Sequence, residues 1–463
     1  MAQPPKMRDA REALERLQRG GNIASAPRRT VMTKKQEEAF ERLQNWQEIE
    51  RLRGVGAAAA EYLVKGPQTA HALLYDPYLF TLLLADIGKA GLVGEKRNAL
   101  AIYLAATSRF LETPLNAIIK GGSSGGKNFL AKTVLKFFPA DAVVAGSSMS
   151  AHAIDYAGPN RLAHKIVYID EQAGLTHPLR QLMSEGRLVR LTSAMVNGVR
   201  VMQEHVTQGP VAGITTTTKN ALAIDDENRN FSVFIDESYE QTKAIARAQA
   251  VTQREPLSQV RLGLWHEVQR LIAKQRSVPI HTPPWFVDIV DKILPYGDLR
   301  IRRYWPSFIL SCKTVARIRA AAWSKQDDEI TVSFDDFATA NCIFDKVVGD
   351  SLTRSGGDAE MAIGDLVERL SERNHNGVRA SDLIGEPGIR SLDQAYRALR
   401  RAKDAGAIFI INDRDRNNEK RYARSPEARF IGTPEFIVTK LGLKISGKYV
   451  HPGTGDRIAY GKD

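Results

Sequence analysis

The chain has 463 residues, 43% hydrophobic and 25% charged, a balance typical of a globular protein with two or three domains. It lacks an apolar run of about 18 residues and an N-terminal apolar segment, so we expect neither a membrane span nor a secretory signal. The net charge of +12 favours an anionic partner, most often nucleic acid.

The first 74 residues carry weak structural signals. Residues 1–33 are rich in Pro, Gly, Ala and Arg, which predicts a basic disordered arm. Residues 34–74 are predicted to be a helical segment, because acidic residues precede basic ones at helical spacing over 34–53.

From residue 75 to residue 250, apolar helices alternate with short apolar strands. The segments 76–91 and 95–111 have helical apolar spacing, and a strand is expected at 116–121. Such alternation favours a parallel sheet with helices on its faces. We therefore expect an α/β core over 75–250, followed by a helical lid over 251–355.

A glycine-rich loop follows the strand expected at 116–121. Its residues are Gly121, Gly122, Ser123, Ser124, Gly125, Gly126 and Lys127. Glycines let backbone N–H groups turn towards phosphate oxygens, the next helix favours an anion at its N-terminus, and the Lys127 ammonium can reach the β- and γ-phosphates. Asn128 stands where Ser or Thr usually helps to hold Mg²⁺, and its amide oxygen can coordinate that ion. The loop predicts ATP with Mg²⁺ as the ligand.

Two acidic residues end the next apolar strand, in HKIVYIDEQ. We expect Asp170 to hold Mg²⁺ at the end of this strand. Glu171 is the expected general base, which polarises the attacking water.

Polar residues near two later strands complete the predicted site. The stretch 210–220 is predicted to be a strand whose end lies beside the glycine-rich loop. A Thr among 215–218, or Asn220, could orient the water, and Thr217 is our choice. Arg229 precedes the strand FSVFI and could reach a neighbouring subunit's γ-phosphate, and the less favoured alternative is a solvent-exposed arginine.

A β-hairpin is predicted before the Thr-rich strand. Asn197-Gly198 is a strong signal for a tight turn between strands at about 188–196 and 199–206. Its basic residues are Arg187, Arg190 and Arg200. The hairpin could enter a ring's central pore and bind a phosphate backbone, or it could be a structural element at the sheet edge.

The C-terminal part has a different pattern. Helices at 358–373, 380–384 and 391–405, followed by a two-stranded ribbon, predict a winged helix over 356–425. The third helix carries Arg397, Arg400, Arg401 and Lys403. This helix could enter a DNA major groove, although winged helices also form protein contacts. Residues 426–463 suggest no element and are expected to be a basic tail.

With these elements in order, the chain resembles the AAA+ ATPases. Among them it is most similar to the minichromosome-maintenance-like and superfamily 3-like replicative helicases of phages, plasmids and integrated mobile elements. The segments that carry the resemblance are GGSSGGKN, IVYIDE, the hairpin, GPVAGITTTT, ENRNF and DESYEQT. The likeness covers roughly 75–350.

The resemblance implies a ring, expected to be a hexamer, with ATP bound between subunits. It implies Lys127 on phosphate, Asp170 on Mg²⁺, Glu171 on water and Arg229 acting on the neighbour. It also implies a second arginine in the lid, for which Arg300, Arg302 and Arg303 are candidates and Arg303 is preferred. DNA is the implied partner, with any primase on a separate chain.

Three functions remain open at this stage. The first is an ATP-dependent DNA helicase or translocase in the replication of a mobile element. The second is an ATP-regulated, DNA-binding helicase loader, and the third is an assembly protein with a degraded site. The first has two departures from the family pattern, namely Asn128 in the loop and the absence of a lysine at the hairpin tip.

Cys312 and Cys342 do not have the spacing of metal ligands. We expect two thiols in a reducing cytoplasm and no zinc site.

Overall fold

The computed structural model describes most of the chain from residue 67 onwards. The described ranges are 67–147, 154, 158, 160–170, 177–196, 199–219, 229–250, 260–294, 301–322, 328–353, 358–371, 378–404, 408–411, 420–424 and 431–461. The predicted arm at 1–33 and most of the predicted segment at 34–74 lie outside these ranges. None of the described helices has both the length and the apolarity needed to cross a membrane.

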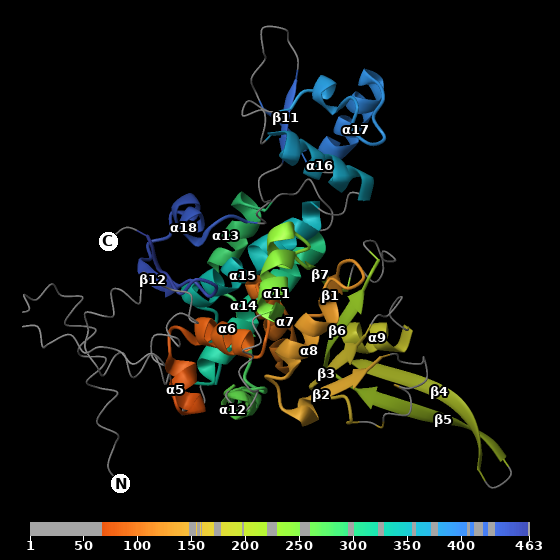
Figure 1. Cartoon of the computed structure of the whole chain (residues 1–463). Helices are drawn as coiled ribbons and strands as arrows, with labels where there is room; N and C mark the ends of the chain where they lie inside the picture. The colour runs from red at the N-terminus through yellow and green to blue at the C-terminus, as the bar shows by residue number, and fades with distance from the viewer. Residues whose placement is uncertain are drawn as a thin grey trace, which may run out of the picture.

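A five-stranded parallel sheet forms the centre of the molecule, with strand order β2-β3-β6-β1-β7 (Figure 1). Its strands are β1 (Ala117–Lys120), β2 (Val143–Gly146), β3 (Lys165–Ile169), β6 (Val211–Thr217) and β7 (Phe231–Phe234). β1 lies between β6 and β7, with Lys120 beside both Thr217 and Phe234. The β1 and β6 strands are buried along their whole length, as expected for parallel strands covered on both faces. The predicted α/β fold is confirmed.

Helices cover this sheet and extend its core. α7 (Lys96–Thr107) is buried from Ala99 to Thr107 and packs against β6, β7 and α8 (Lys127–Leu135). Three shorter helices complete this part: α5 (Ala70–Tyr75), α6 (Leu79–Lys89) and α9 (His177–Glu185). The helices expected at 76–91 and 95–111 thus form at α6 and α7.

The expected helical lid shares one hydrophobic core with the sheet. Its long helices are α12 (Leu262–Lys274), α13 (Trp285–Lys292), α14 (Ile301–Ala320) and α15 (Phe334–Thr353). α15 packs against β7 and α7, and the same apolar cluster includes Trp265, Phe308 and Phe344 together with Ile119. This lid is therefore continuous with the sheet in the structure.

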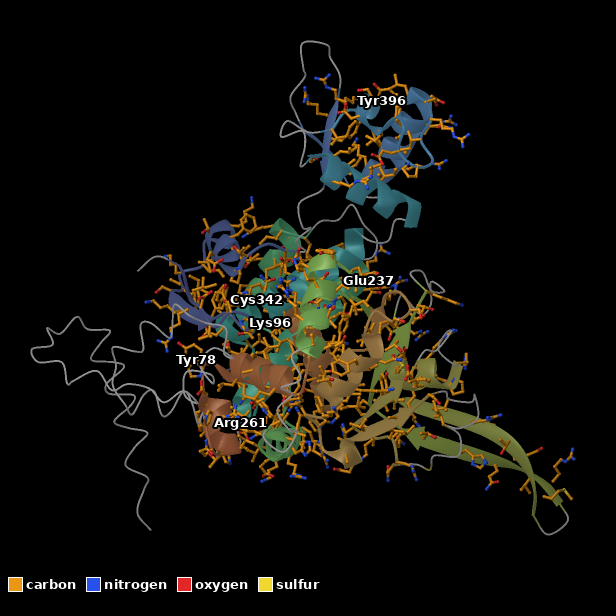
Figure 2. The ribbon with its side chains drawn as sticks, viewed as in Figure 1. Tyr78, Lys96, Glu237, Arg261, Cys342 and Tyr396 are labelled. Carbon is orange, nitrogen blue, oxygen red and sulfur yellow. The ribbon has the colours of Figure 1, made fainter. Side chains whose placement is uncertain are left out.

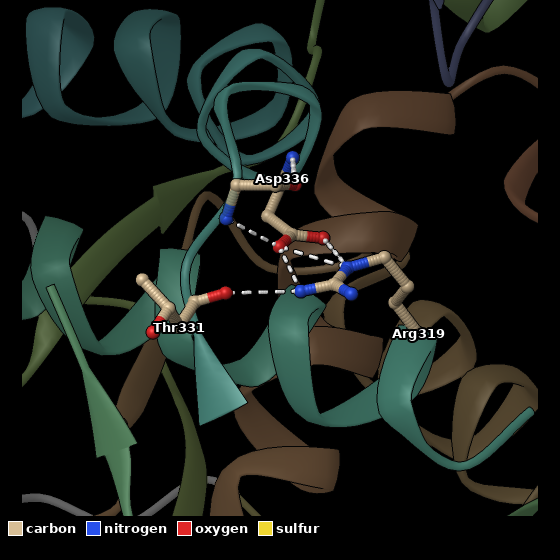
Figure 3. Close-up of polar contacts among 4 residues, drawn as sticks. Arg319, Thr331 and Asp336 are labelled. Carbon is tan, nitrogen blue, oxygen red and sulfur yellow. Dashed lines mark hydrogen bonds and ion pairs between the residues drawn. The ribbon is translucent and has the colours of Figure 1, made fainter. Parts of the chain in front are cut away.

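Buried ion pairs join helices within this core. Arg319 donates to both carboxylate oxygens of Asp336 at 2.9–3.0 Å and also to the Thr331 carbonyl (Figure 3). These contacts join α14 to the short parallel pair β8 (Ile280–His281) and β9 (Ile330–Thr331) and to α15. Similarly, the buried Asp86 carboxylate accepts hydrogen bonds from Arg261 and Trp265, at 2.8 Å each. The sequence pattern did not predict β8 and β9.

The predicted hairpin is confirmed and projects from the sheet (Figure 1). β4 (Arg187–Val196) pairs antiparallel with β5 (Val199–Gln208), and Val196 is opposite Val199. This register leaves two residues for the turn, as Asn197-Gly198 predicted, although the turn itself lies outside the described residues.

The C-terminal region consists of two parts. The inserted unit, residues 358–424, contains α16 (Asp358–Ser371), the 3-10 helix η4 (Ala380–Leu383), α17 (Leu392–Asp404), and the antiparallel strands β10 (Ile408–Ile411) and β11 (Arg421–Arg424). It has a hydrophobic cluster of its own, which includes Val367, Leu399 and Tyr422. The order of elements matches the predicted one, and the winged-helix assignment remains a prediction.

The last part corrects the expectation of a basic tail. Residues 431–461 form α18 (Pro434–Leu441) and the hairpin of β12 (Gly447–Val450) and β13 (Arg457–Tyr460). Ile437, Tyr449 and Tyr460 belong to the main core, and Tyr460 donates to Asp335 at 2.8 Å. These apolar side chains are spread over short elements, so no strong periodicity marked them in the sequence.

Candidate nucleotide-binding site

The glycine-rich segment at residues 121–127, here called the phosphate loop, joins the end of β1 to the start of α8. Gly126 has a φ of +89° and is the N-cap residue of α8, a conformation that glycine adopts without strain. α8 begins at Lys127, so its first N–H groups and its dipole point towards the loop. The local structure is therefore suited to bind an anion such as phosphate.

Lys127 lies at the bottom of the loop. Its side chain is buried, and the ammonium donates to the carbonyl oxygens of Gly121 at 2.9 Å and Gly122 at 2.5 Å. Ser123 and Ser124 are exposed at the tip of the loop, where Ser124 has a φ of +66°. The loop thus places a positive charge beside its backbone N–H groups.

Three oxygen-bearing side chains meet beside the phosphate loop. The Thr216 hydroxyl donates to the Asn128 amide oxygen at 2.8 Å and lies 3.4 Å from Asp170 Oδ1. The Tyr168 hydroxyl also approaches Asn128, at 3.5 Å. β6 lies between β1 and β3 in the sheet, so Thr216 is placed between Asn128 on α8 and Asp170 after β3.

Thr216, rather than Thr217, reaches this cluster. Successive side chains of a strand point to opposite faces, so only one of these two neighbours can face Asn128. The Thr217 hydroxyl instead accepts a hydrogen bond from the Lys219 backbone N–H at 3.1 Å. The Thr-rich sequence showed that a threonine would lie here, and the register of β6 decides which one does.

The residues of this cluster fit Mg²⁺. Carboxylate, amide and hydroxyl oxygens are the ligands that this cation prefers, and it is commonly bound by one or two carboxylates together with water and substrate phosphates. Asp170 and Asn128, both predicted metal ligands, lie within hydrogen-bonding reach of the same hydroxyl. Among the described residues there is no group of three or more His, Cys, Asp or Glu side chains that could hold a metal ion.

A second lysine neutralises Asp170. The Lys132 ammonium, on the exposed side of α8, donates to Asp170 Oδ2 at 2.8 Å. No sequence pattern predicts this pair, because the two residues are 38 positions apart and Lys132 resembles an ordinary surface lysine.

The two predicted arginines are both exposed, Arg229 before β7 and Arg303 on α14. Arg229 is exposed and donates to the Ser184 hydroxyl. It precedes β7, and Phe231 pairs with Ala117, the first residue of β1. Arg229 therefore lies near the N-terminal ends of these two strands, whereas the phosphate loop follows the C-terminal end of β1. Arg303 is exposed on the first turn of α14, as is Arg302. Glu171, Asn220 and Arg300 lie outside the described residues.

A carboxylate that sequence reasoning did not assign lies against the phosphate loop. Glu237 Oε1 accepts a hydrogen bond from the Gly122 backbone N–H at 2.5 Å. Figure 2 labels this residue, which belongs to the segment between β7 and α11 (Tyr239–Ala250). Its only sequence signal was its place in DESYEQT, which carried part of the resemblance.

The comparisons with known proteins agree with this geometry. No curated protein matches the chain. Residues 80–272, which include the whole sheet and the phosphate loop, match the family model described as the MTBMA_p00010 P-loop domain. This part of the chain is therefore similar to a P-loop domain, and together with the α/β sheet the match supports a P-loop nucleoside triphosphatase.

Proposed function

We propose that this chain is an ATP-dependent DNA helicase or translocase in the replication of a phage, plasmid or integrated mobile element. ATP would be hydrolysed between the subunits of a ring, expected to be a hexamer. The observation that supports the ATPase part most strongly is the meeting of Asn128, Thr216 and Asp170 beside the phosphate loop. The DNA part is supported by exposed basic side chains on the hairpin and on α17.

In the proposed reaction, water attacks the γ-phosphorus and ADP leaves with the bridging oxygen. The loop N–H groups hold the phosphates in place, and Lys127 offsets the charge that spreads over the transferred group. Mg²⁺, held through Asp170 and Asn128, would neutralise further phosphate charge. Thr216 is placed to orient the attacking water, and Glu171 would accept its proton.

Arg229 is proposed to act on the neighbouring subunit. Arg229 lies near the N-terminal ends of β1 and β7, whereas the phosphate loop follows the C-terminal end of β1. This separation favours action in trans over action in its own site. An arginine supplied in this way can contribute a ~10³–10⁵-fold increase in turnover. Arg303 is proposed as the second arginine, and its exposure on α14 is compatible with a contact between subunits.

Basic side chains support contact with DNA at two places. On the hairpin, Arg200 is exposed next to the turn, while Arg187 is exposed and lies 3.7 Å from Glu204. On α17, the four basic residues named above are exposed, whereas Ala395, Leu399 and Ala402 are buried. A phosphate backbone is the ligand that such surfaces bind without sequence preference.

ATP hydrolysis with and without single-stranded DNA, across a series of salt concentrations, tests the proposal. We expect DNA to stimulate turnover, and the stimulation to fall as salt rises. Lys127→Ala should lose nucleotide binding, while Glu171→Gln should bind ATP and lose turnover. Turnover that ignores DNA would favour the loader alternative, and normal turnover in Glu171→Gln would remove Glu171 as the base.

Mixed rings test the arginine. Arg229→Ala alone should bind ATP and turn over poorly. Rings mixed from Arg229→Ala and Lys127→Ala subunits should regain part of the activity, because an intact loop can then meet an intact arginine from its neighbour. Absence of any recovery would argue against action in trans.

A further inference from the structure

The position of Glu237 is unusual for a carboxylate, because it lies where a phosphate loop binds anions. Its Oε1 atom accepts from the Gly122 N–H, one of the loop N–H groups that would serve a nucleotide phosphate. The same oxygen lies 3.0–3.1 Å from the points where β-carbons would stand at Gly121, Gly122 and Gly125. The carboxylate therefore lies close to three glycines of the loop at once.

The segment that carries Glu237 is fixed to the loop by its neighbours. Ile235 continues the pairing of β7, since its N–H donates to the Lys120 carbonyl at 3.1 Å. A β-carbon at Gly125 would lie 2.3 Å from Ile235 Cδ1, so this apolar side chain packs directly on the loop backbone. The loop glycines thus allow both Ile235 and Glu237 to come close.

The same segment is held on its other side by the start of α7. Glu95 Oε1 accepts from the Asp236 N–H at 2.7 Å, and Asn98 donates to the Phe234 carbonyl at 2.8 Å. Asp236 is itself used to shape the turn, because its carboxylate accepts from the Ser238 N–H at 2.9 Å. Of the two adjacent acids, only Glu237 contacts the phosphate loop among the described contacts.

The helix that follows has little other attachment. Within α11, Gln241 is the one buried side chain, and its amide donates to the Val93 carbonyl at 2.8 Å. The remaining side chains of α11 are exposed or half-buried. Release of Glu237 from the loop would therefore remove a contact just before α11, beside those made by Ile235, Asp236 and Gln241.

We infer that Glu237 is an internal competitor of the nucleotide. Its carboxylate occupies the anion-binding side of the phosphate loop and is displaced when a phosphate binds. The inference rests on the proposed nucleotide binding. Both anions would use N–H groups of the same loop and carry the same sign of charge, so they would compete for it. Nucleotide binding is thereby coupled to the attachment of α11.

Nucleotide affinity of Glu237→Gln tests this inference, with Glu240→Gln as the matched control. Glu240 is exposed on the first turn of α11 and undergoes the same change in charge. Removal of a charge-assisted hydrogen bond that competes with the ligand should tighten binding of ATP and ADP by about tenfold in Glu237→Gln. The control should match the wild type. AMP, which lacks the β- and γ-phosphates, should gain much less.

Hydrogen exchange of the α11 amides provides a second readout. In the wild type, ADP should increase exchange in 239–250, because the nucleotide displaces Glu237. In Glu237→Gln the exchange should already be high without nucleotide and should change little on addition.

The outcomes separate this inference from the proposed function. If the wild type binds ATP and Lys127→Ala does not, but Glu237→Gln equals Glu240→Gln in affinity and exchange, the competitor role is wrong and nucleotide binding stands. Weaker binding in Glu237→Gln would also overturn it, because Glu237 would then belong to the ligand's own contacts. If the wild type binds neither ATP nor ADP, the proposed function fails first.

Discussion

The body and the inserted unit bury their apolar residues in different ways. In the body, meaning the described residues outside 354–430, the sheet, the helices α5–α8 and α12–α15, and residues 431–461 contribute to one large cluster, while α9 forms a second cluster with residues of β3, β4 and β6. The inserted unit has a small cluster of its own, and no described residue is common to both. The nucleotide site thus depends on a large cooperative core, whereas the basic surface of α17 depends on a small independent one.

The largest expected effect is a loss of stability confined to the body, in Arg319→Ala. This change leaves the buried Asp336 carboxylate without its cation, and because Arg319 is half-buried the cost should lie below the about 3–5 kcal/mol of a fully buried pair and above that of an exposed one. Denaturant unfolding should show the body transition shifted to lower denaturant. A matched change in the inserted unit, Arg369→Ala, removes the exposed partner of Glu386 and should cost less than about 1 kcal/mol. Equal costs would contradict the contrast between the two cores.

Excision of residues 354–430, with a short flexible linker in their place, should separate ATP binding from the binding of duplex DNA. The body cluster loses no residue, so ATP binding and the body's unfolding midpoint should stay close to those of the full chain. Affinity for duplex DNA should fall about 100-fold at moderate salt, because the phosphate contacts proposed for α17 are removed. An insoluble or unfolded product would show that the body needs the unit after all.

A smaller change to the same surface should have a graded effect. Arg400 and Arg401 are exposed on α17, and their double change to Gln should weaken DNA binding about tenfold. The slope of log affinity against log salt should fall by about 2, at roughly 0.9 for each phosphate contact. Fluorescence anisotropy measures both the affinity and the slope. Arg369→Gln on α16 serves as a control, because it makes the same arginine-to-glutamine change on another helix of the inserted unit. An unchanged slope would favour a protein partner for this helix.

The smallest expected effect concerns alkaline pH and is again confined to the body. Burial raises the pKa of Tyr103 from 10.0 to about 12, although its hydrogen bond with Gln269 and the nearby Arg109 act in the opposite direction. A raised pKa means that this contribution to stability is complete below pH 10 and is lost as the pH rises towards 12. Between pH 9 and pH 11, Tyr103→Phe should therefore lose about 1 kcal/mol less stability than the wild type. Parallel losses in the two proteins would contradict this assignment.

The sequence predicted the parts of the site that depend on local pattern. The glycines before Lys127, the apolar strand before Asp170 and the Asn-Gly turn each specify their structure within about ten residues of chain. It did not predict contacts that depend on tertiary register. Thr216 rather than Thr217 faces Asn128 because of how β6 pairs with β1, and Lys132 reaches Asp170 only after α8 has packed.

Contacts over long sequence separation were equally out of reach. Glu237 meets Gly122 across 115 residues, and its segment reads as an ordinary polar turn. Residues 431–461 looked like a tail because their apolar side chains occur singly in short elements, and it is the packing against α13 and α15 that makes them part of the core. The roles of Glu171 and the two arginines remain predictions.

The points where the chain leaves and rejoins the body have a mechanical consequence. The chain leaves at Thr353, the end of α15, and returns at Ile431, whose N–H donates to Asp345 on the same helix, while Asn341 holds the Gly432 carbonyl. Asp345 and Thr353 are eight residues apart, roughly 12 Å along the axis of α15. Both connections of the inserted unit therefore lead to one helix, α15, and two connections restrict the rotation of a domain more than one does. α15 packs directly against β7, the neighbour of the strand that ends in the phosphate loop.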